Sequence, residues 1–286
     1  MKVLLHGGAG PNSEHPYKRQ EVLDEAAEAG AHKDTPKEAV VSAVRALEGS
    51  EHFNAGVGGS VQSDGVIRTD AGVMKDDLSV GAVCGMRGVK KPIRVADLVM
   101  EETPHVLLAG EKAAALAEGF GVKTDSDLRT EETKKRWQKA TAGKDLSDTA
   151  SQIGFSEEMF GTDTVGAVAF DEETGSTAAG TSTGGRWFAV PGRVGDVPQV
   201  GSGFYCNGTA AASATGIGED IARVTLCRLT VEEVSSGLDP QEATRSAVER
   251  FEERTGSKAG VIATDSQGET GSFYNTEEMQ TSVAEE

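Results

Sequence analysis

A threonine opens what looks like a buried strand in the segment GTDTVGAVAFD, residues 161–171. Small and β-branched residues follow Thr164, as is typical of a core strand, whereas a long polar stretch precedes it. A threonine hydroxyl is a weak nucleophile that needs a base beside it. Cutting the chain between Asp163 and Thr164 would supply that base, because a free α-amine has a pKa of about 7.7–8.0 and is partly neutral near neutral pH. The sequence therefore predicts that the chain is cut here and that Thr164 then acts as a nucleophile.

A serine nucleophile is the competing interpretation of the same region. Residues 180–184, GTSTG, match the G-x-S-x-G elbow of serine hydrolases, and HGGAG at residues 6–10 resembles their oxyanion loop. That elbow requires a helix directly after the serine, but the following GRWFAVPGRVGD contains glycines and a proline. The catalytic order also requires a later histidine, and all five histidines precede Ser182. Because both requirements fail, we reject Ser182 as the nucleophile.

Groups suited to a small zwitterionic substrate lie further along the chain. PGRVGD places Arg193 and Asp196 in one turn, where the guanidinium could bind a carboxylate and the carboxylate an ammonium. ATGIGED offers the Thr215 hydroxyl and the Gly216 amide beside an expected helix start, where they could stabilise an oxyanion. From spacing alone, a salt bridge within the turn and a helix cap explain these residues equally well.

The charge balance limits the class of partner. Forty-six acidic residues against 28 basic ones give a formal net charge of −18, and the acids are spread along the chain. Nucleic acids and anionic membranes require clustered positive charge, so neither is an expected partner. Evenly spread acid fits a salt-rich cytoplasm, such as that of a halophilic archaeon, because salt screens the self-repulsion.

Signals for cofactors and for membrane insertion are missing from the sequence. The three cysteines form neither a CxxC pair nor a metal-ligand cluster with the histidines, and no phosphate-binding glycine motif is complete. No stretch reaches the roughly 18 apolar residues of a membrane span. The first ten residues, MKVLLHGGAG, are too short for a signal-peptide core and instead suggest a strand and a turn. We therefore expect a cytoplasmic protein whose chemistry needs no cofactor.

The expected elements place these residues on a layered α+β fold. Strands cluster, then helices, then strands, in both halves, which favours antiparallel sheets with helices packed outside rather than a βαβ alternation. Residues 142–160 are polar and are expected to form a mobile loop. The expected helices are 18–30, 35–48, 92–102, 106–118, 130–141, 217–235 and 240–255. The expected strands are the N-terminal one, 66–74, 78–86, 164–171, 176–183, 186–190, 259–265 and 270–275.

Taken in order, the motifs resemble those of the plant-type asparaginase, or isoaspartyl peptidase, family of N-terminal-nucleophile hydrolases. The resemblance runs through HGGAG, FNAGVGGSVQSDGVIRTDAGVMKDD, DTVGAVAFD, AAGTSTGG, PGRVGD and ATGIGE, and covers nearly the whole chain except residues 124–160. It implies one four-layer αββα sandwich domain over residues 1–286. The precursor would cleave itself into an α subunit, 1–163, and a β subunit, 164–286, with residues 124–160 as a mobile linker before the cut.

The resemblance also assigns roles to single residues. Thr164 would be the nucleophile of cleavage and catalysis, and Thr183 its supporting threonine. Arg193 and Asp196 would hold the substrate's α-carboxylate and α-ammonium. The further site positions are Thr215 and Gly216 for the oxyanion and side chain, with Gly218 alongside and Asn54 from the α subunit. A loop like the family's sodium loop would bind Na⁺ or K⁺ through the carbonyls of Leu47, Glu48, Ser50, Phe53, Ala55 and Val57.

The implied activity is hydrolysis of L-asparagine or of β-aspartyl peptides to release L-aspartate, by a dimer of αβ units. Two alternatives remain open. The AAGTST and AAASATG stretches are closer to glycosylasparaginases, which share the nucleophile but take a glycan-bearing asparagine. A catalytically silent, uncleaved binding homologue is the other, although such a protein would have no need of the whole residue set.

Overall fold

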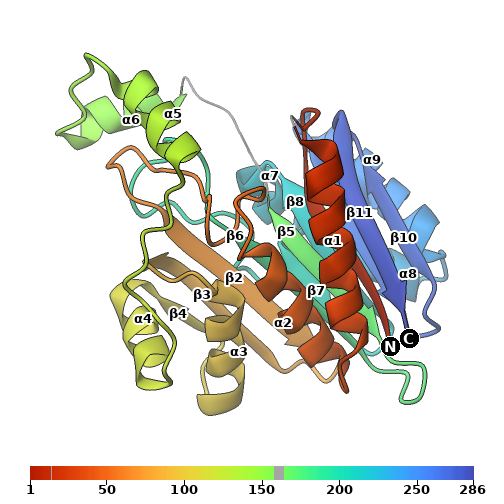
Figure 1. Cartoon of the computed structure of the whole chain (residues 1–286). Coiled ribbons are helices and arrows are strands. Elements are labelled where there is room, and N and C mark those ends of the chain that lie inside the picture. The colour runs from red at the N-terminus through yellow and green to blue at the C-terminus, as the bar shows by residue number, and fades with distance from the viewer. Residues whose placement is uncertain (14, 158–163) are drawn as a thin grey trace.

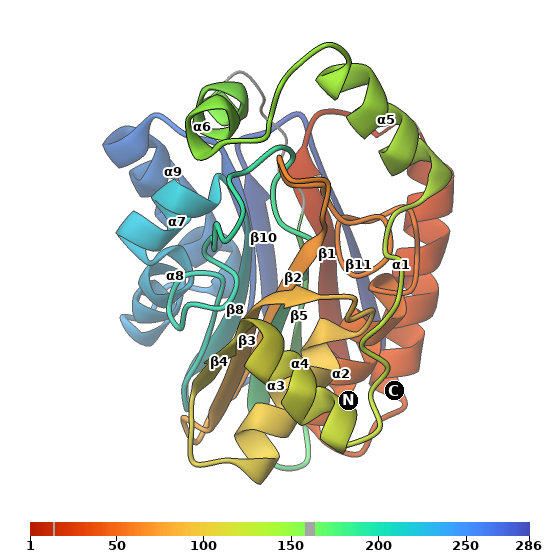
Figure 2. The ribbon, with the colours of Figure 1, turned by 90° about the vertical axis from the view of Figure 1, so that its left-hand side faces the viewer.

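Two β-sheets pack face to face, and helices cover the outer side of each sheet (Figures 1 and 2). The computed structural model describes residues 1–13, 15–157 and 164–286. Asp163, on the predicted cleavage bond, lies outside the described residues, whereas Thr164 lies within them. The layer order is therefore helix, sheet, sheet, helix, as expected for the αββα sandwich.

The larger sheet has seven strands in the order β11-β1-β5-β6-β2-β3-β4. All its neighbouring pairs are antiparallel except β3 with β4. The strands are β1 (Lys2–Gly10), β2 (Arg68–Lys75), β3 (Val80–Arg87), β4 (Leu107–Ala109), β5 (Val165–Phe170), β6 (Thr177–Thr183) and β11 (Glu278–Glu285).

The smaller sheet has four antiparallel strands in the order β10-β9-β8-β7. Its strands are β7 (Phe204–Cys206), β8 (Ala210–Gly216), β9 (Ala259–Asp265) and β10 (Thr270–Tyr274). Side chains from both sheets form the apolar layer between them, including Val168, Phe204 and Ile262. Small residues let the sheets approach closely: a Cβ on Gly72 would lie 2.0 Å from the Phe204 ring.

Helices cover the outer face of each sheet, and a further pair lies at one end of the sandwich. Four of them pack on the larger sheet: α1 (Pro16–Ala31), α2 (Pro36–Leu47), α3 (Pro92–Glu102) and α4 (Gly110–Gly119). Three pack on the smaller sheet: α7 (Gly218–Val224), α8 (Leu226–Ser235) and α9 (Pro240–Thr255). Two more, α5 (Glu131–Thr141) and α6 (Thr149–Glu157), lie at one end of the sandwich (Figure 1). No helix of the described residues is long and apolar enough to cross a membrane.

Local signals explain where several helices begin and end. The Thr35 side chain accepts a hydrogen bond from the Glu38 amide at the start of α2, where Pro36 occupies the first turn. Asp239 caps α9 in the same way, and Gly256 ends that helix in the left-handed conformation. These caps fix the bounds of helices that cover the two sheets.

Several sequence expectations differ from the structure. Residues 186–190 form no strand: Phe188 has a φ of +57°, outside the β region, and its side chain lies in a fully buried cluster. The expected helix 217–235 is two helices, because Thr225 between them also has a positive φ of 55°. The expected helix 106–118 begins only at Gly110, after β4. Within 124–160, α5 was expected and α6 was not, whereas the mobility of this stretch stays a prediction.

Candidate active site

Three polar side chains lie side by side across the larger sheet at the front of β5. Val165 is opposite Ser182, and so the preceding Thr164 stands opposite Thr183. Thr183 is in turn opposite Asp70 of β2. Only 6% of Thr164, 4% of Thr183 and 2% of Asp70 is exposed. Directly opposed residues point to the same face of a sheet, so these side chains share the side that faces the smaller sheet.

The end of β6 is tied to the predicted site residue Asn54. The Asn54 side-chain amide donates to the Gly185 carbonyl at 2.7 Å, and its oxygen accepts from the Ser60 amide at 2.7 Å. The Gly184 amide donates to the Asn54 carbonyl at 2.8 Å, and the Gly185 amide donates to the Thr183 hydroxyl at 3.1 Å. Asn54 thus belongs to the same hydrogen-bond network as Thr183.

A buried hydroxyl chain joins β1, β8 and β6 beneath Thr164. Ser213 Oγ lies 2.9 Å from His6 Nε2 and 2.7 Å from Thr181 Oγ1, which donates to the Gly203 carbonyl at 2.7 Å. Because a carbonyl can only accept, Thr181 donates to it, Ser213 donates to Thr181, and His6 donates from Nε2. Burial lowers the pKa of His6 to about 3, and a contact with the Thr164 backbone opposes this only in part. His6 is therefore a neutral imidazole.

Thr215 and the clamp residues approach this site from the smaller sheet. The Thr215 hydroxyl is fully buried and accepts from the Ala9 amide at 3.3 Å, so its own proton is available for another acceptor. Gly218 begins α7, and a Cβ there would lie 2.6 Å from Asp196 Oδ1 and 2.8 Å from Arg193 Nη2. Gly218 therefore packs directly on the pair that the sequence singled out.

Arg193 and Asp196 do not simply pair with each other. The Arg193 guanidinium binds Glu219 through two hydrogen bonds, Nε to Oε1 at 2.8 Å and Nη2 to Oε2 at 2.9 Å. Burial raises the pKa of Glu219, but the hydrogen bonds and charge of Arg193 outweigh it and lower that pKa to about 2. The turn salt bridge considered from spacing is replaced by an ion pair with the helix that follows β8.

Asp196 and Asp70 are two buried carboxyls near one guanidinium. Asp196 Oδ2 is buried and has no hydrogen-bond partner among the described residues. Burial raises the pKa of Asp196 to about 6, although the charge of Arg193 lowers it. Burial also raises the pKa of Asp70 to about 7, opposed by the Gly85 amide and by Arg193. An orphaned buried carboxylate oxygen beside a cation is what a substrate ammonium would satisfy.

The structure brings most predicted site residues together. Thr183 and Asn54 share one hydrogen-bond network, and Thr164 stands opposite Thr183 in the sheet. The Asp196 carbonyl accepts from the Gly203 amide, and the Gly203 carbonyl accepts from Thr181. Ser182 points to the helix side instead, where its hydroxyl donates to Glu48 at 2.7 Å. This agrees with its rejection as a nucleophile.

Sequence reasoning missed four polar residues of this region. Glu219 follows directly on the ATGIG stretch, so its position beside Arg193 had a signal in the sequence. Asp70 and Ser213 lie inside strands, and His6 was noted only as part of HGGAG. Their places follow from strand register, which spacing along the chain does not reveal.

The loop of residues 47–57 contains the predicted cation ligands. The Val57 amide donates to the Glu48 carbonyl at 3.1 Å, so the loop closes on itself. Gly56 has a φ of +61°, and a Cβ there would lie 2.4 Å from the carbonyl oxygens of both Glu48 and Lys90. The Glu48 carbonyl is the predicted ligand that lies at this turn, and cation binding by the loop stays a prediction. The candidate carbonyls are those of Leu47, Glu48, Ser50, Phe53, Ala55 and Val57.

The four-layer sandwich has the N-terminal-nucleophile hydrolase fold. A family model described as asparaginase matches residues 1–286. The chain therefore belongs to the asparaginase family.

Individual relatives agree with this. The plant-type L-asparaginase of Pyrococcus abyssi is 40% identical over 98% of this chain and 94% of its own length. The plant-type L-asparaginase of Thermococcus kodakarensis is 38% identical over 97% of this chain and 94% of its own length. The isoaspartyl peptidase/L-asparaginase of Xenopus laevis is 36% identical over 97% of this chain and 90% of its own length.

Proposed function

We propose that the chain cleaves itself before Thr164 and then hydrolyses the side-chain amide of L-asparagine and of β-aspartyl peptides, releasing L-aspartate. The observation that carries this proposal is the buried, unpartnered Asp196 oxygen beside Arg193, on the side of the sheet where Thr164 and Thr183 meet. The names of the relatives, plant-type L-asparaginase and isoaspartyl peptidase/L-asparaginase, support the same substrates.

In the cleaved enzyme, the α-amine of Thr164 takes the proton of its own hydroxyl, and Oγ attacks the side-chain carbonyl of the substrate. Negative charge develops on the carbonyl oxygen, which the Thr215 hydroxyl stabilises together with the Gly216 amide. The carbon–nitrogen bond then breaks, and the leaving amine or ammonia takes the proton from the α-ammonium. Water attacks the ester in a second round of the same chemistry, and aspartate leaves. Thr183, opposite Thr164, orients its hydroxyl or amine.

The clamp selects the aspartyl half of the substrate. Arg193 is held by Glu219 and offers its remaining hydrogen-bonding edge to the α-carboxylate. Asp196 binds the α-ammonium, and Gly218 leaves room for the backbone of the substrate beside both. A carboxylate and an ammonium bound in this way fix the position of the side-chain amide relative to Thr164.

Further features of the family are proposed here as well. We propose that the loop of residues 47–57 binds Na⁺ or K⁺ for structural purposes, and that two processed units form an (αβ)₂ dimer. A reducing cytoplasm is the proposed location, since all three cysteines are free and buried.

Self-cleavage and substrate choice are tested together. Purified wild-type protein and the Thr164→Ala variant are followed by intact-mass measurement in low-salt and high-salt buffer. Two fragments that meet between Asp163 and Thr164 are expected for the wild type and not for the variant. The cleaved protein is then assayed with L-asparagine, a β-aspartyl dipeptide and a glycosylated asparagine. A wild-type chain that stays intact in every buffer refutes the proposal, and preference for the glycosylated substrate would replace it with the glycosylasparaginase alternative.

A further inference from the structure

A cavity of about 380 Å³ adjoins the network of Asn54. Its wall includes Gly8 of β1, Phe53, Asn54, Trp187 and Arg136 of α5. Asn54 is the link to the reacting groups, because its amide binds the Gly185 carbonyl next to the Gly184–Thr183 end of β6. The cavity therefore begins one hydrogen-bonded layer away from Thr183 and the nucleophile opposite it.

The size and lining of this cavity do not suit ammonia, the leaving group of free asparagine. Ammonia needs little more space than one water molecule, which occupies roughly 30 Å³. The lining is also chemically mixed: aromatic faces and glycine backbone lie beside the guanidinium groups of Arg19 and Arg136 and the carboxyl groups of Glu51, Glu132 and Glu278. Such a wall suits an amino-acid residue with an apolar part and a charged end.

The positively charged group of this wall that can bind a carboxylate is the guanidinium of Arg136. Its guanidinium stacks over the Trp187 ring at 4.2 Å from the ring centroid. Burial lowers the pKa of Arg136, opposed by the charge of Glu132 one turn earlier. Within residues 1–13, 15–157 and 164–286, no group forms a hydrogen bond or ion pair with this guanidinium. Arg136 as a whole is exposed, so its guanidinium, stacked on Trp187 and without an acceptor, is open to a carboxylate.

The other arginine in the wall is already occupied. Arg19 donates to the carbonyls of Gly7 at 2.6 Å and His52 at 2.8 Å and to the Gln280 side chain at 3.2 Å. It also stacks over Phe53 at 4.7 Å. Arg19 therefore holds the cavity wall together, whereas Arg136 remains open to a ligand.

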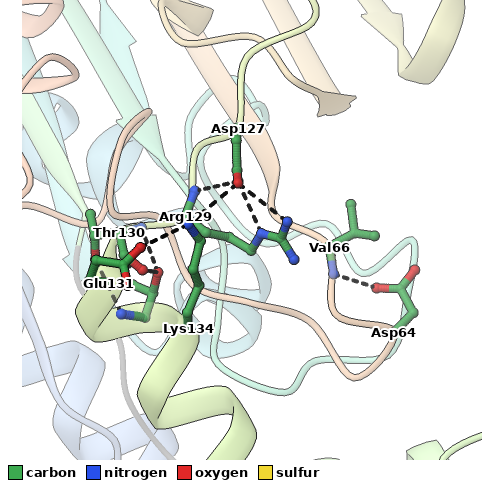
Figure 3. Close-up of polar contacts among 8 residues, drawn as sticks. Asp64, Val66, Asp127, Arg129, Thr130, Glu131 and Lys134 are labelled. Carbon is green, nitrogen blue, oxygen red and sulfur yellow. Dashed lines mark hydrogen bonds and ion pairs between the residues drawn. The ribbon is translucent and has the colours of Figure 1, made fainter.

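The segment that carries Arg136 is anchored to the body of the protein. Thr130 and Thr133 cap α5 reciprocally, and Asp127 binds Arg129 and Lys134 just before and within that helix (Figure 3). Leu128 is buried, and its carbonyl accepts from the Gly58 amide at 2.9 Å. His15, at the N-cap of α1, and Arg19 of α1 line the same cavity as Arg136. The start of this segment is thus tied to the loop of Gly58, and Trp187 stacks against the guanidinium itself.

We infer that this cavity is the leaving-group subsite and that Arg136, stacked on Trp187, binds the free α-carboxylate of the residue released from a β-aspartyl dipeptide. The inference rests on the proposed function and narrows it, because it makes β-aspartyl dipeptides with a free C-terminus the preferred substrate class. Arg136 and Trp187 are then specificity-determining residues, on opposite sides of the predicted cut.

The test compares two substrates that differ only in this carboxylate: β-aspartyl-alanine and its C-terminal amide. Cleavage at Thr164 is first established by intact mass, and turnover is first established with L-asparagine. The wild type is expected to show a kcat/KM about tenfold or more higher for the free acid, mainly through KM. In Arg136→Gln this ratio falls to near one. Lys135→Gln removes the same charge from the neighbouring, exposed position and keeps the wild-type ratio.

Two results would refute the assignment of this cavity as the leaving-group subsite. One is a wild-type enzyme that hydrolyses acid and amide equally well, a comparison that needs no variant. The other is an Arg136→Gln enzyme that loses activity on both to the same degree and so keeps the ratio. An intact chain, or a cleaved chain inactive on L-asparagine, refutes the proposed function itself and is recognised before the two substrates are compared.

Discussion

The Arg193 guanidinium has one occupied edge and one open edge. Its Nε and Nη2 are bound by Glu219, whereas Nη1 makes no hydrogen bond with any described residue. A bidentate pair fixes the plane of a guanidinium as well as its position. A substrate carboxylate therefore meets a donor that is already oriented, and less side-chain entropy is lost on binding.

Replacing Glu219 by glutamine is expected to weaken substrate binding more than it slows the chemical steps. The substitution keeps the shape and removes the charge that orients Arg193, so KM for L-asparagine rises about tenfold while kcat changes much less. Steady-state kinetics of the cleaved enzyme measure both parameters. Glu249→Gln, at an exposed position of α9, is the control with the same change of charge. A fall in kcat with unchanged KM would contradict this orienting role.

The pH dependence of substrate capture should report Asp196. Burial raises its pKa to about 6, against the opposing charge of Arg193, so below pH 6 the free enzyme holds this side chain protonated. The protonated acid no longer attracts the substrate ammonium, and kcat/KM for L-asparagine is expected to fall as the pH decreases through 6. The α-amine of Thr164 must be neutral to act as the base, so its protonation causes a separate fall in kcat/KM as the pH decreases through its reference pKa of about 7.7–8.0.

The Asp196→Asn variant separates these two declines. It should be on the order of 100-fold less active in kcat/KM, because the ammonium loses a charged partner, and it should lack the decline near pH 6. The fall in kcat/KM that the α-amine of Thr164 causes near pH 7.7–8.0 should remain. Persistence of the lower decline in this variant would assign it to another group, such as Asp70, whose pKa burial raises to about 7.

At the scale of elements, the sequence predicted those helices and strands whose formation depends on nearby residues in the chain. Helices such as α2 and α9 and the β-branched strand β5 were predicted correctly, whereas the substrate-binding role of Arg193 and Asp196 stays a prediction. The strand β8, AAASATG, was missed because alanine favours helices, and only its burial between β7 and β9 makes it a strand. β11 was missed because its alternation is largely polar, and pairing with β1 determines it.

The roles of Asp70 and Ser213 could not be predicted for a related reason. Each lies inside a strand, and its neighbours across the sheet or between the sheets are distant in sequence. Register places Asp70 beside Thr183, and sheet packing places Ser213 between His6 and Thr181. Both placements are properties of the assembled sandwich.

The close approach of the two sheets gives a prediction about stability. A methyl group on Gly72 would lie 2.0 Å from the Phe204 ring in the layer between the sheets, so Gly72→Ala is expected to destabilise the fold by about 1–3 kcal/mol. Gly119→Ala makes the same substitution at the end of α4, where no heavy atom lies within 4 Å of the new Cβ. That variant should be neutral or slightly more stable. Urea unfolding of both variants measures the difference, and equal stabilities would show that the sheets separate at little cost.

At the scale of the whole molecule, charge is the dominant feature. The net charge of −18 produces self-repulsion in the folded state, which salt screens over a Debye length of about 10 Å at 0.1 M and 3 Å at 1 M. Exposed ion pairs such as Arg228 with Glu232 contribute little to stability. The folded protein should therefore become more stable as ionic strength rises.

Thermal unfolding in different chlorides separates this screening from binding at the loop of residues 47–57. Screening depends on ionic strength alone, so NaCl, KCl and choline chloride should raise the Tm by equal amounts between 0.1 and 2 M, by several degrees if the gain is ~1–2 kcal/mol. A loop that binds a small cation through carbonyl oxygens adds an increase that saturates at low concentration and is absent in choline chloride, because a quaternary ammonium cannot enter a ring of carbonyls. Three superimposable curves would refute the cation site and retain the halophilic interpretation of the charge. A Tm that does not change with any salt would refute that interpretation.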